Sequence, residues 1–353
     1  MNIYEDFRNE ELTEKLADKI QSYKGPDLKI MEVCGSHTDA IGKYGIRDIL
    51  PKNVTLVSGP GCPVCVTDKK YMDTAIELCK RENVIICSFG DLIKVKGTGE
   101  KLVLGENVRV VLSPFECIKT AMDNPDREVV FLSVGFETTT PITALTIKKA
   151  YENNIKNLSF FVSNKTMPGI LHFLMDMKTD VNAFLFPGHV ATIEGCEFYR
   201  NFCYEYNIKG TVCGFEPADI LASVAFIMYG EEKFKNLYTR FVKEKGNQMS
   251  KAAVNEVFEM CDTYLREIGT VKNAGLKIRN KYADFDVCHK FGIDYSPIDQ
   301  PKEKHCLCGE ILLGRKTPKD CPLFGKACRP NDAVGPCMVS EEGTCATYYK
   351  YKI

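Results

Sequence analysis

Short apolar segments alternate with longer amphipathic segments along the first two thirds of the chain. Eight apolar segments have the length of strands, and they span residues 29–33, 54–58, 84–88, 108–112, 129–134, 158–162, 183–186 and 210–213. Segments with one apolar face at helical spacing lie between most of them, at residues 68–81, 114–122, 140–153, 169–177 and 194–206. Strands that alternate with helices predict parallel sheets flanked by helices, which is the α/β class.

Breaks in this pattern indicate how the chain is divided into domains. Residues 1–28 have a helical pattern, and Asn124-Pro125-Asp126 separates the fourth predicted strand from the fifth, which favours two sheets over one. We therefore predict two Rossmann-like parallel-sheet domains and a third domain that is helical and Cys-rich. Their predicted boundaries are 29–120 and 121–228 for the two sheets, and 1–28 with 229–353 for the third.

The last third of the chain has a different composition. Two helices are predicted at residues 231–245 and 251–268, with no strand of matching strength between them. From Pro297 onward the chain is rich in Pro, Gly, Cys and Lys, and it is too poor in apolar residues to form a core of its own. Another source of stability is needed, and cysteine-bound metal is the one that this segment offers.

Charge and hydropathy exclude two classes of partner. The 353 residues include 46 Lys and Arg against 47 Asp and Glu, which gives a formal net charge of −1, and no run is polybasic. The chain therefore shows no electrostatic footprint for nucleic acid or for an anionic membrane. Because the apolar runs have only strand length and the N-terminus is polar, we predict a cytoplasmic protein without a signal peptide or a transmembrane helix.

Seventeen cysteines are unusual in a cytoplasmic chain. In a reducing compartment, metal binding or redox catalysis explains so many thiols better than disulfides do. Six cysteines lie in the last 48 residues. Eight others lie in helix-like or strand-like surroundings and are interpreted as small core residues: Cys79, Cys87, Cys117, Cys196, Cys203, Cys213, Cys261 and Cys288. The remaining three follow the first two predicted strands.

The first candidate site follows the strand at 29–33, which runs directly into Cys34-Gly35-Ser36-His37. Ligands of open α/β sheets bind beyond the carboxyl ends of the strands. A helix that begins here would favour the thiolate of Cys34, and the imidazole of His37 could reach the same centre. A buried structural cysteine beside a hydrogen-bonded histidine fits the same residues, so both interpretations stay open.

The second candidate site follows the strand at 54–58, where Cys62 and Cys65 form a C-x-x-C motif before the helix predicted at 68–81. This is the arrangement of thioredoxin-type dithiols, in which the helix N-terminus lowers the pKa of the first thiol and the spacing permits a disulfide. The same pair could be half of a zinc site. No second C-x-x-C or H-x-x-H lies at finger spacing, so the redox dithiol is the preferred interpretation.

The C-terminal cysteines offer a third candidate site. The chosen quartet has the spacing C-x12-C-x6-C-x16-C and consists of Cys308, Cys321, Cys328 and Cys345. Four thiolates suit either tetrahedral zinc or an iron–sulfur cluster, and composition alone leaves zinc slightly favoured. A metal that only holds the tail together is the purely structural interpretation.

Five motifs in a fixed order carry a family resemblance. They are Cys34-Gly-Ser-His-Thr38, Gly59-Pro-Gly-Cys-Pro-Val-Cys65, Gly135-Phe-Glu-Thr-Thr-Thr-Pro141, Pro187-Gly-His-Val190 and the segment from Cys306-Leu-Cys-Gly-Glu310 to Tyr348-Tyr349. Together they resemble the HypD family, which takes part in assembling the iron centre of nickel–iron hydrogenases. The resemblance spans nearly the whole chain, and it implies three domains of α/β type and a 4Fe–4S cluster in the C-terminal part.

Roles for the candidate residues follow from this resemblance. It implies that Cys34 binds the iron with His37 nearby, and that Cys62 and Cys65 are the redox pair. Its cluster ligands map best onto Cys308, Cys321, Cys328 and Cys345, which leaves Cys306 and Cys337 as the alternatives. One departure is Asp39, where the expected motif reads Cys-Gly-Ser-His-Thr-His. The roles of His189 and Glu137, both at strand ends, stay open.

The resemblance also implies partners and a reaction. The Fe(CN)2CO group is expected to be assembled between this chain and HypC, with cyanide delivered by HypE. The Cys62/Cys65 dithiol would supply electrons for cyanide release, and the cluster would reduce it again. Two other hypotheses remain: a general thiol–disulfide oxidoreductase with a zinc-stapled tail, and a non-catalytic adaptor whose cysteines are structural.

Overall fold

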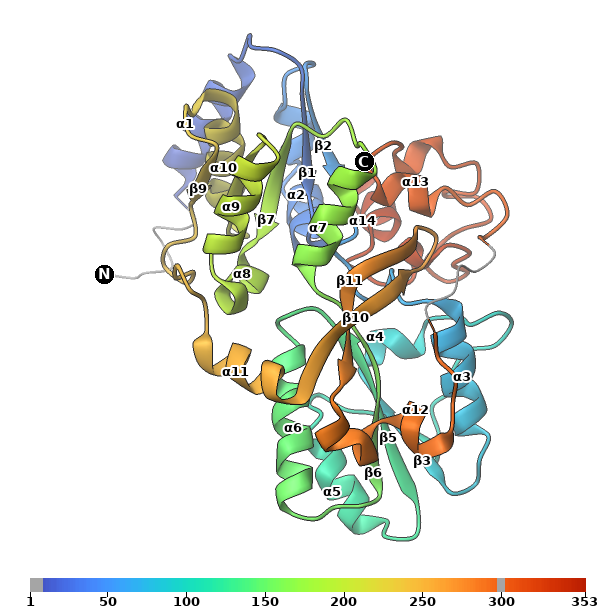
Figure 1. Ribbon diagram of the computed structural model, residues 1–353. Helices are drawn as coiled ribbons and strands as arrows, with labels where there is room; N and C mark the ends of the chain where they lie inside the picture. The colour runs from blue at the N-terminus through green and yellow to red at the C-terminus, as the bar shows by residue number, and fades with distance from the viewer. Residues whose placement is uncertain (1–8, 297–301) are drawn as a thin grey trace. The chain divides into compact units, whose positions relative to one another are not determined.

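The computed structural model describes residues 9–296 and 302–353, which fall into two compact units (Figure 1). Unit 1 comprises Met1–Cys62, Leu174–Asn247 and Glu303–Ile353, and unit 2 comprises Pro63–Phe173 and Gln248–Lys302. Each unit is built around a parallel sheet, as the alternation of strands and helices predicts. In the part of the chain that the structure describes, no helix is both long enough and apolar enough to cross a membrane.

Unit 1 contains a sheet of five parallel strands in the order β2-β1-β7-β8-β9. The strands are β1 (Leu28–Glu32), β2 (Val54–Ser58), β7 (Ala183–Pro187), β8 (Lys209–Cys213) and β9 (Phe234–Asn236). The accompanying helices are α1 (Glu10–Gln21), α2 (Gly35–Lys43), α8 (Gly188–Glu194), α9 (Glu197–Glu205) and α10 (Pro217–Tyr229). The central strand β7 is buried at every position, which is typical of a parallel sheet.

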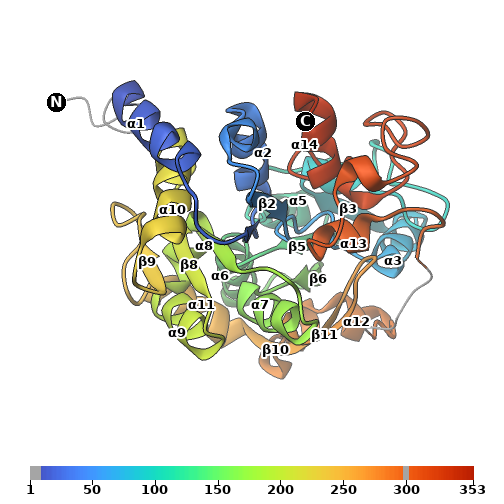
Figure 2. The same cartoon turned by 90° about the horizontal axis from the view of Figure 1, so that it is seen from above.

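Helices α1 and α10 lie side by side in unit 1 (Figure 2). The Tyr229 hydroxyl donates a 2.8 Å hydrogen bond to the carbonyl of Lys19 and so ties the C-terminal ends of the two helices together. Ile20 of α1 and Leu221 of α10 are buried in one core with Ile30 of the sheet. Burial of one apolar stripe per helix therefore holds this layer on the sheet, as the helical period predicts.

Unit 2 contains a second parallel sheet in the order β4-β3-β5-β6. Its strands are β3 (Val84–Ser88), β4 (Val108–Val110), β5 (Glu128–Gly135) and β6 (Leu158–Asn164). Its helices are α3 (Lys69–Cys79), α4 (Gly90–Ile93), α5 (Glu116–Asp123), α6 (Thr140–Glu152), α11 (Gln248–Val257) and α12 (Val287–Phe291), and α7 (Met167–Asp176) follows β6 and ends in unit 1. Phe131, Phe160 and Ile147 are fully buried in its core.

An antiparallel hairpin of β10 (Phe258–Leu265) and β11 (Gly269–Ile278) completes unit 2. Its tip carries two charged residues that are almost fully buried, Arg266 and Glu267, which are 4% and 3% exposed. The backbone N–H of Arg266 donates a 3.1 Å hydrogen bond to the carbonyl of Val66. The hairpin tip therefore packs on the segment that follows Cys65.

The predicted strands are confirmed, since β1 to β8 coincide with the eight apolar segments to within a few residues. The predicted grouping of these strands is wrong. The chain leaves the first sheet after β2 and returns to it at β7, so the boundary between 29–120 and 121–228 cuts through both sheets. Hydrophobic periodicity predicts local structure only. It cannot show that Ile30 of β1 pairs with Ala183 of β7, because these residues are far apart in the sequence.

The predicted third domain is also corrected. Residues 303–353 belong to unit 1, and their helices are short: α13 (Cys308–Leu312) and α14 (Thr344–Tyr351). The helix predicted at 231–245 is β9 with turns, and the one at 251–268 ends at Val257, where β10 begins. One face of β10 packs in unit 2, so burial alternates along the strand. This packing favours a strand, although the sequence of the segment has a helical period. Residues 1–8 of the first predicted helix lie outside the described part of the chain.

Candidate functional site

The carboxyl edge of the unit 1 sheet gathers the residues that the sequence singles out. Because β1, β2, β7 and β8 are parallel, the loops that follow them emerge at one edge. These loops carry Cys34 after β1, Cys62 after β2, His189 after β7 and Phe215 after β8. The carboxyl ends of these strands therefore lie at one edge of the sheet, although half of the strands come from the second part of the sequence.

Cys34 is the N-cap residue of α2, and its side chain is 3% exposed. Its Sγ lies 3.7 Å from Nε2 and 3.8 Å from Nδ1 of His189. Burial raises the pKa of Cys34 to about 12, the Glu342 carboxylate adds to the rise, and the backbone N–H groups of His37 and Ser36 oppose it. The expectation of a thiolate stabilised by the helix N-terminus is thus not met, since loss of solvent outweighs those N–H groups.

His37 and His189 lie on the ring of Phe215. The ring centroids are 4.6 Å apart for His37 and 5.1 Å apart for His189, and both pairs are stacked. Nε2–H of His37 donates a 2.9 Å hydrogen bond to the carbonyl of Gly214, which fixes the proton on that nitrogen. Nδ1 of His37 is buried without a hydrogen-bond partner among the described residues. Burial lowers the pKa of each imidazole to about 4, so both rings are neutral at pH 7.

Two glycines allow the backbone to close around Cys34. A Cβ on Gly61 would lie 2.3 Å from the backbone N of Cys34, and a Cβ on Gly35 would lie 2.5 Å from Cβ of Glu342. Both distances are shorter than real Cβ contacts allow. The loop of Cys62 and the C-terminal tail therefore approach Cys34 at positions where only glycine fits.

The C-terminal tail is attached to the Cys34 helix by polar contacts. The Ser36 hydroxyl donates a 2.8 Å hydrogen bond to Oε1 of Glu342. Further along α2, Asp39 accepts hydrogen bonds from Lys350 at 3.1 Å and from the Tyr351 hydroxyl at 3.0 Å. Asp39, the position that departs from the expected motif, thus anchors α14 to α2.

A buried carboxylate holds the ends of β1 and β2 in register. Glu32 is fully buried, and its Oε1 accepts hydrogen bonds from Ser58 at 2.6 Å and from Arg47 at 2.8 Å. Burial raises the pKa of Glu32, while Arg47 and Ser58 counter the rise by favouring the charged form. The strand end before Cys34 is therefore held by this ion pair as well as by the backbone hydrogen bonds between β1 and β2.

Cys62 and Cys65 are both disulfide-bonded, and they are 4% and 0% exposed. They lie between β2 and α3, where the sequence predicts them. Asp68 is the N-cap of α3, and its side chain accepts a hydrogen bond from the backbone N–H of Tyr71. The segment thus has the strand–loop–helix context of a redox dithiol, and its redox chemistry stays a prediction.

One member of the predicted cluster quartet has another cysteine as its partner in the structure. Cys308 is disulfide-bonded to Cys337, and the assignment of the cluster ligands stays a prediction. Sequence spacing could not distinguish Cys306 from Cys308, because the two are separated by a single residue.

Cys306 lies near the three other predicted ligands Cys321, Cys328 and Cys345. Cys321, Cys328 and Cys345 are buried and free. Burial raises the pKa of Cys345, and the nearby thiols of Cys306, Cys328 and Cys321 raise it further, so the four sulfurs are electrostatic neighbours. The backbone N–H of Val334 also donates to Sγ of Cys328 at 3.4 Å. As thiolates the four sulfurs would repel one another, so a bound cation would favour their deprotonated form.

The four sulfur donors do not surround a single ion position. Within the described residues, no group of three or more His, Cys, Asp or Glu side chains is arranged around the position of a single ion. A cubane cluster spreads its thiolates over four iron atoms, so its ligands do not converge on one point. Four sulfur donors with an N–H···S hydrogen bond fit such a cluster.

Taken together, the fold and the site define a cysteine-rich α/β protein with a buried thiol–imidazole site and a separate group of four thiols. The family model described as "HypD: Hydrogenase formation hypA family" matches residues 10–352. The chain therefore belongs to the HypD family and is a hydrogenase maturation factor.

Three relatives illustrate the similarity. A putative hydrogenase expression/formation protein of Methanocaldococcus jannaschii is 42% identical over 96% of this chain and 94% of its own length. The hydrogenase maturation factor HypD of Azotobacter vinelandii is 38% identical over 99% and 97%. That of Escherichia coli is 38% identical over 92% and 89%. The resemblance inferred from five motifs is thus confirmed over nearly the full length.

Sequence reasoning left the role of His189 open and missed Glu342 at the Cys34 site. His189 is the histidine that contacts the sulfur, and its position in Pro187-Gly188-His189 after a strand was the available signal. Glu342 had no local signal, because its relevance comes from the packing of the tail against α2.

Proposed function

We propose that this chain is the scaffold and redox protein on which the Fe(CN)2CO group of nickel–iron hydrogenase is assembled together with HypC, with cyanide delivered by HypE. The observation that carries the proposal is the buried contact between Cys34 Sγ and the imidazole of His189 at the carboxyl edge of a parallel sheet. Membership of the HypD family supports it.

Cys34 is proposed to anchor the iron that becomes the product. A soft thiolate suits low-spin ferrous iron that carries cyanide and carbon monoxide. Because the pKa of Cys34 is raised to about 12, iron must displace the proton of the thiol, so that Cys–SH and Fe²⁺ give Cys–S–Fe and H⁺. The neutral ring of His189 is in contact with the sulfur, and the free Nδ1 of His37 offers a second acceptor in the same cluster of rings.

Cys306, Cys321, Cys328 and Cys345 are proposed to hold the resident 4Fe–4S cluster. When bound, such a cluster stores and transfers single electrons. Cys306, Cys321 and Cys328 lie outside the helices α13 and α14 of the tail, and Cys345 lies in the first turn of α14. The tail has few apolar residues, so metal ligation would stabilise it. The Cys308–Cys337 disulfide closes the same segment independently of the cluster.

Cys62 and Cys65 are proposed to be each other's redox partner. Release of cyanide from a partner cysteine that carries it as a thiocyanate requires two electrons. The reduced pair supplies them: thiocyanate and two thiols give the partner thiol, hydrogen cyanide and the Cys62–Cys65 disulfide. Cys62 and Cys65 are disulfide-bonded in this structure, which is the form that this step would leave.

Infrared spectroscopy of the complex with HypC tests the proposal. Cys34→Ala should abolish the cyanide and carbonyl bands of the purified complex and leave its iron–sulfur absorbance intact. Cys203→Ala is the matched control, because Cys203 is also buried in unit 1 but lies on α9. Bands that persist in Cys34→Ala would show that the iron is held elsewhere. A zinc-only protein without bands would instead favour the general oxidoreductase with a zinc-stapled tail.

A further inference from the structure

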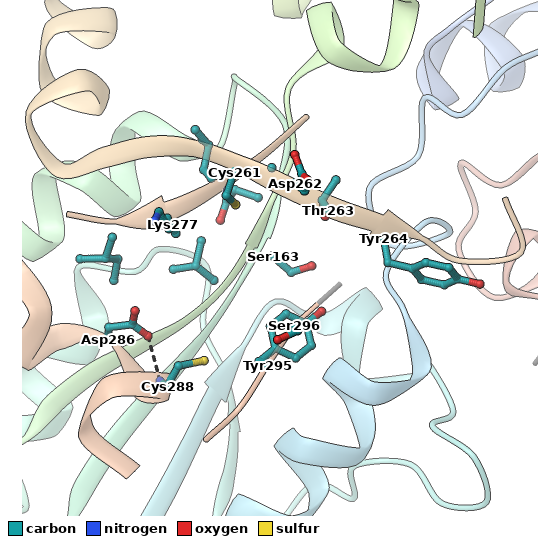
Figure 3. Close-up of a pocket in the computed structure, with 15 residues that line it drawn as sticks. Ser163, Cys261, Asp262, Thr263, Tyr264, Lys277, Asp286, Cys288, Tyr295 and Ser296 are labelled. Carbon is teal, nitrogen blue, oxygen red and sulfur yellow. Dashed lines mark hydrogen bonds between the residues drawn. The ribbon is translucent and has the colours of Figure 1, made fainter. Parts of the chain in front are cut away.

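A cavity of about 460 Å³ lies in unit 2 (Figure 3). It is bounded by the end of β6, by both strands of the β10–β11 hairpin and by the segment that follows α12. Ser163 and Tyr295 both line it, and Ser163 lies just above Tyr295 in the view of Figure 3. Volumes of this size hold several water molecules or a small ligand.

Behind Ser163 lies a lysine that solvent does not reach. Lys165 is 0% exposed, and its Nζ donates hydrogen bonds of 2.9 Å to both the carbonyl and the hydroxyl of Ser163. In the described part of the chain no carboxylate is hydrogen-bonded to this amine. A buried ammonium without a contacting counter-ion is unstable, and burial accordingly lowers the pKa of Lys165 to about 8.

Behind Tyr295 lies a buried carboxylate. Asp68 is 2% exposed, and it accepts hydrogen bonds from the backbone N–H of Tyr71 at 2.7 Å and from the Tyr295 hydroxyl. Its charge acts on Lys165 and raises the pKa of that amine against the effect of burial. The cavity is therefore connected to an acid–base pair by two hydroxyl groups, Ser163 on the lysine side and Tyr295 on the aspartate side.

Asp68 begins the helix that follows Cys65. Cys65 is 0% exposed and is disulfide-bonded, and Asp68 lies just beyond it in the same loop. When the disulfide is opened, the sulfur of Cys65 leaves as a thiolate. Because a buried thiolate is unstable in a medium of low dielectric, a proton must be delivered to this sulfur. The cavity, the two hydroxyls and the acid–base pair supply the parts of a route for that proton.

We propose that Lys165, Asp68, Tyr295 and Ser163 form a proton relay that carries a proton between the unit 2 cavity and Cys65 when its disulfide is opened or closed. The relay rests on the redox role proposed for Cys62 and Cys65. In reduction by an external dithiol, one thiolate attacks the sulfur of Cys62, and the S–S bond breaks so that Cys65 leaves as a thiolate. The ammonium of Lys165 protonates it, and water in the cavity restores that proton through Ser163.

The second thiol of the reductant completes the exchange. Its thiolate attacks the mixed disulfide, Cys62 leaves and takes the remaining proton, and the reductant becomes a cyclic disulfide. Asp68 maintains the cationic form of Lys165 between steps, and Tyr295 holds the carboxylate in place. Oxidation of the pair runs through the same transfers in reverse.

The other titratable groups around the relay do not exchange protons in the neutral range. Burial raises the pKa of Tyr71 and of Tyr295, and it raises those of Cys261 and Cys288 to about 11 and about 12. The charged groups that act on these side chains are Lys70, Asp286, Asp294, Lys277, Asp262 and Glu259. Lys165 is therefore the group of this cluster that controls the pH profile near pH 8.

The rate at which dithiothreitol reduces Cys62 and Cys65 in the full chain tests the relay. The rate is measured by differential alkylation and mass spectrometry from about pH 6 to 9.5. It is divided by the rate for a small model disulfide, so that the pH dependence of the dithiothreitol thiolate is removed. The wild-type ratio should fall as Lys165 loses its proton near pH 8. Lys165→Met and Asp68→Asn should slow reduction at pH 7 by about tenfold and remove this inflection. Tyr295→Phe should slow it by about threefold.

Lys70→Met is the matched control, because Lys70 lies 5.8 Å from the ring centre of Tyr295 but is given no part in the proposed proton transfer, and it should keep the wild-type profile. If circular dichroism shows that Lys165→Met does not fold, Tyr295→Phe and Asp68→Asn test the relay in its place. Wild-type rates and profiles in these variants would overturn the relay and leave the redox proposal standing. A wild-type pair that never exchanges with dithiothreitol would overturn both.

Discussion

The hydroxyl of Ser36 donates a hydrogen bond of 2.8 Å to the carboxylate of Glu342. Ser36 lies two residues after the candidate iron ligand, and Glu342 lies in the tail that carries the candidate cluster ligands. The contact joins the two chemically active parts of unit 1 across most of the sequence. It also places a negative charge near Cys34, where it raises the pKa of the thiol.

Removal of that charge should make Cys34 more acidic. In Glu342→Gln the pKa of Cys34 should fall, and alkylation of Cys34 at pH 8 should become about twofold faster. The effect should be modest, and it should shrink at high salt because Glu342 is exposed to solvent. Glu341→Gln is the control, since the neighbouring Glu341 is exposed and does not contact Ser36 through its side chain. An unchanged pH profile of alkylation in Glu342→Gln would contradict this prediction.

The cluster ligands can be tested through the pair Cys306 and Cys308. Cys306→Ala should lose most of the bound iron and acid-labile sulfide, because it removes one of four thiolates. Cys308→Ala should retain both, since Cys308 is disulfide-bonded to Cys337. Metal and sulfide analysis of the two variants, purified without oxygen, checks the assignment. The opposite outcome would restore Cys308 as the ligand and leave Cys306 as the free cysteine.

The two buried histidines predict how stability depends on pH. The pKa of His37 and of His189 is lowered from 6.5 to about 4 by burial. The unfolded chain therefore binds protons that the folded chain does not, and stability that is complete above pH 6.5 is lost as the pH falls toward 4. The loss should be on the order of 3 kcal/mol for each imidazole once the pH has fallen to 4.

Urea titration at several pH values measures this dependence. The double variant His37→Gln with His189→Gln should show a flatter dependence between pH 7 and 5, whatever its absolute stability. His289→Gln is the control, because His289 is exposed on the described surface. A wild-type protein whose stability does not change from pH 7 to 5 would argue against neutral, buried imidazoles at this site.

Local features of the fold were predictable from the sequence, and long-range ones were not. The apolar runs of β1 to β8 identify strands because a buried parallel strand needs a continuous apolar segment. The same runs do not show which strands pair with each other. The pairing of β7 with β1, which brings the chain back to the first sheet, was therefore missed. The hairpin β10–β11 was missed because its first strand follows a helix without a turn residue between them.

The candidate site shows the same limit. Cys34, Cys62 and Cys65 were recognised because glycine and cysteine at strand ends are a local signal. The partner of Cys34 was assigned to His37, which is close in sequence, whereas His189 contacts the sulfur because β7 is the neighbour of β1. The choice between Cys306 and Cys308 depended on the position of Cys337, which spacing alone does not fix.

Gly61 offers a test of how closely the Cys62 loop must approach Cys34. A Cβ at this position would lie 2.3 Å from the backbone N of Cys34 and 2.4 Å from the carbonyl oxygen of Val33. These are backbone atoms of the strand end and cannot move aside as a flexible side chain would. Gly61→Ala should therefore displace the loop and lower the free energy of unfolding by about 2 kcal/mol.

The functional consequence of Gly61→Ala should exceed its effect on stability. Displacement of the loop moves Cys62 away from Cys34, so electron delivery to a group on Cys34 should fail even where the protein is folded. Gly99→Ala is the matched control, because a Cβ on Gly99 would meet no atom within 4 Å. Unfolding curves combined with the infrared bands of the HypC complex measure both effects. A Gly61→Ala protein with wild-type bands would show that the closeness of this loop to Cys34 is a packing feature and not a requirement of assembly.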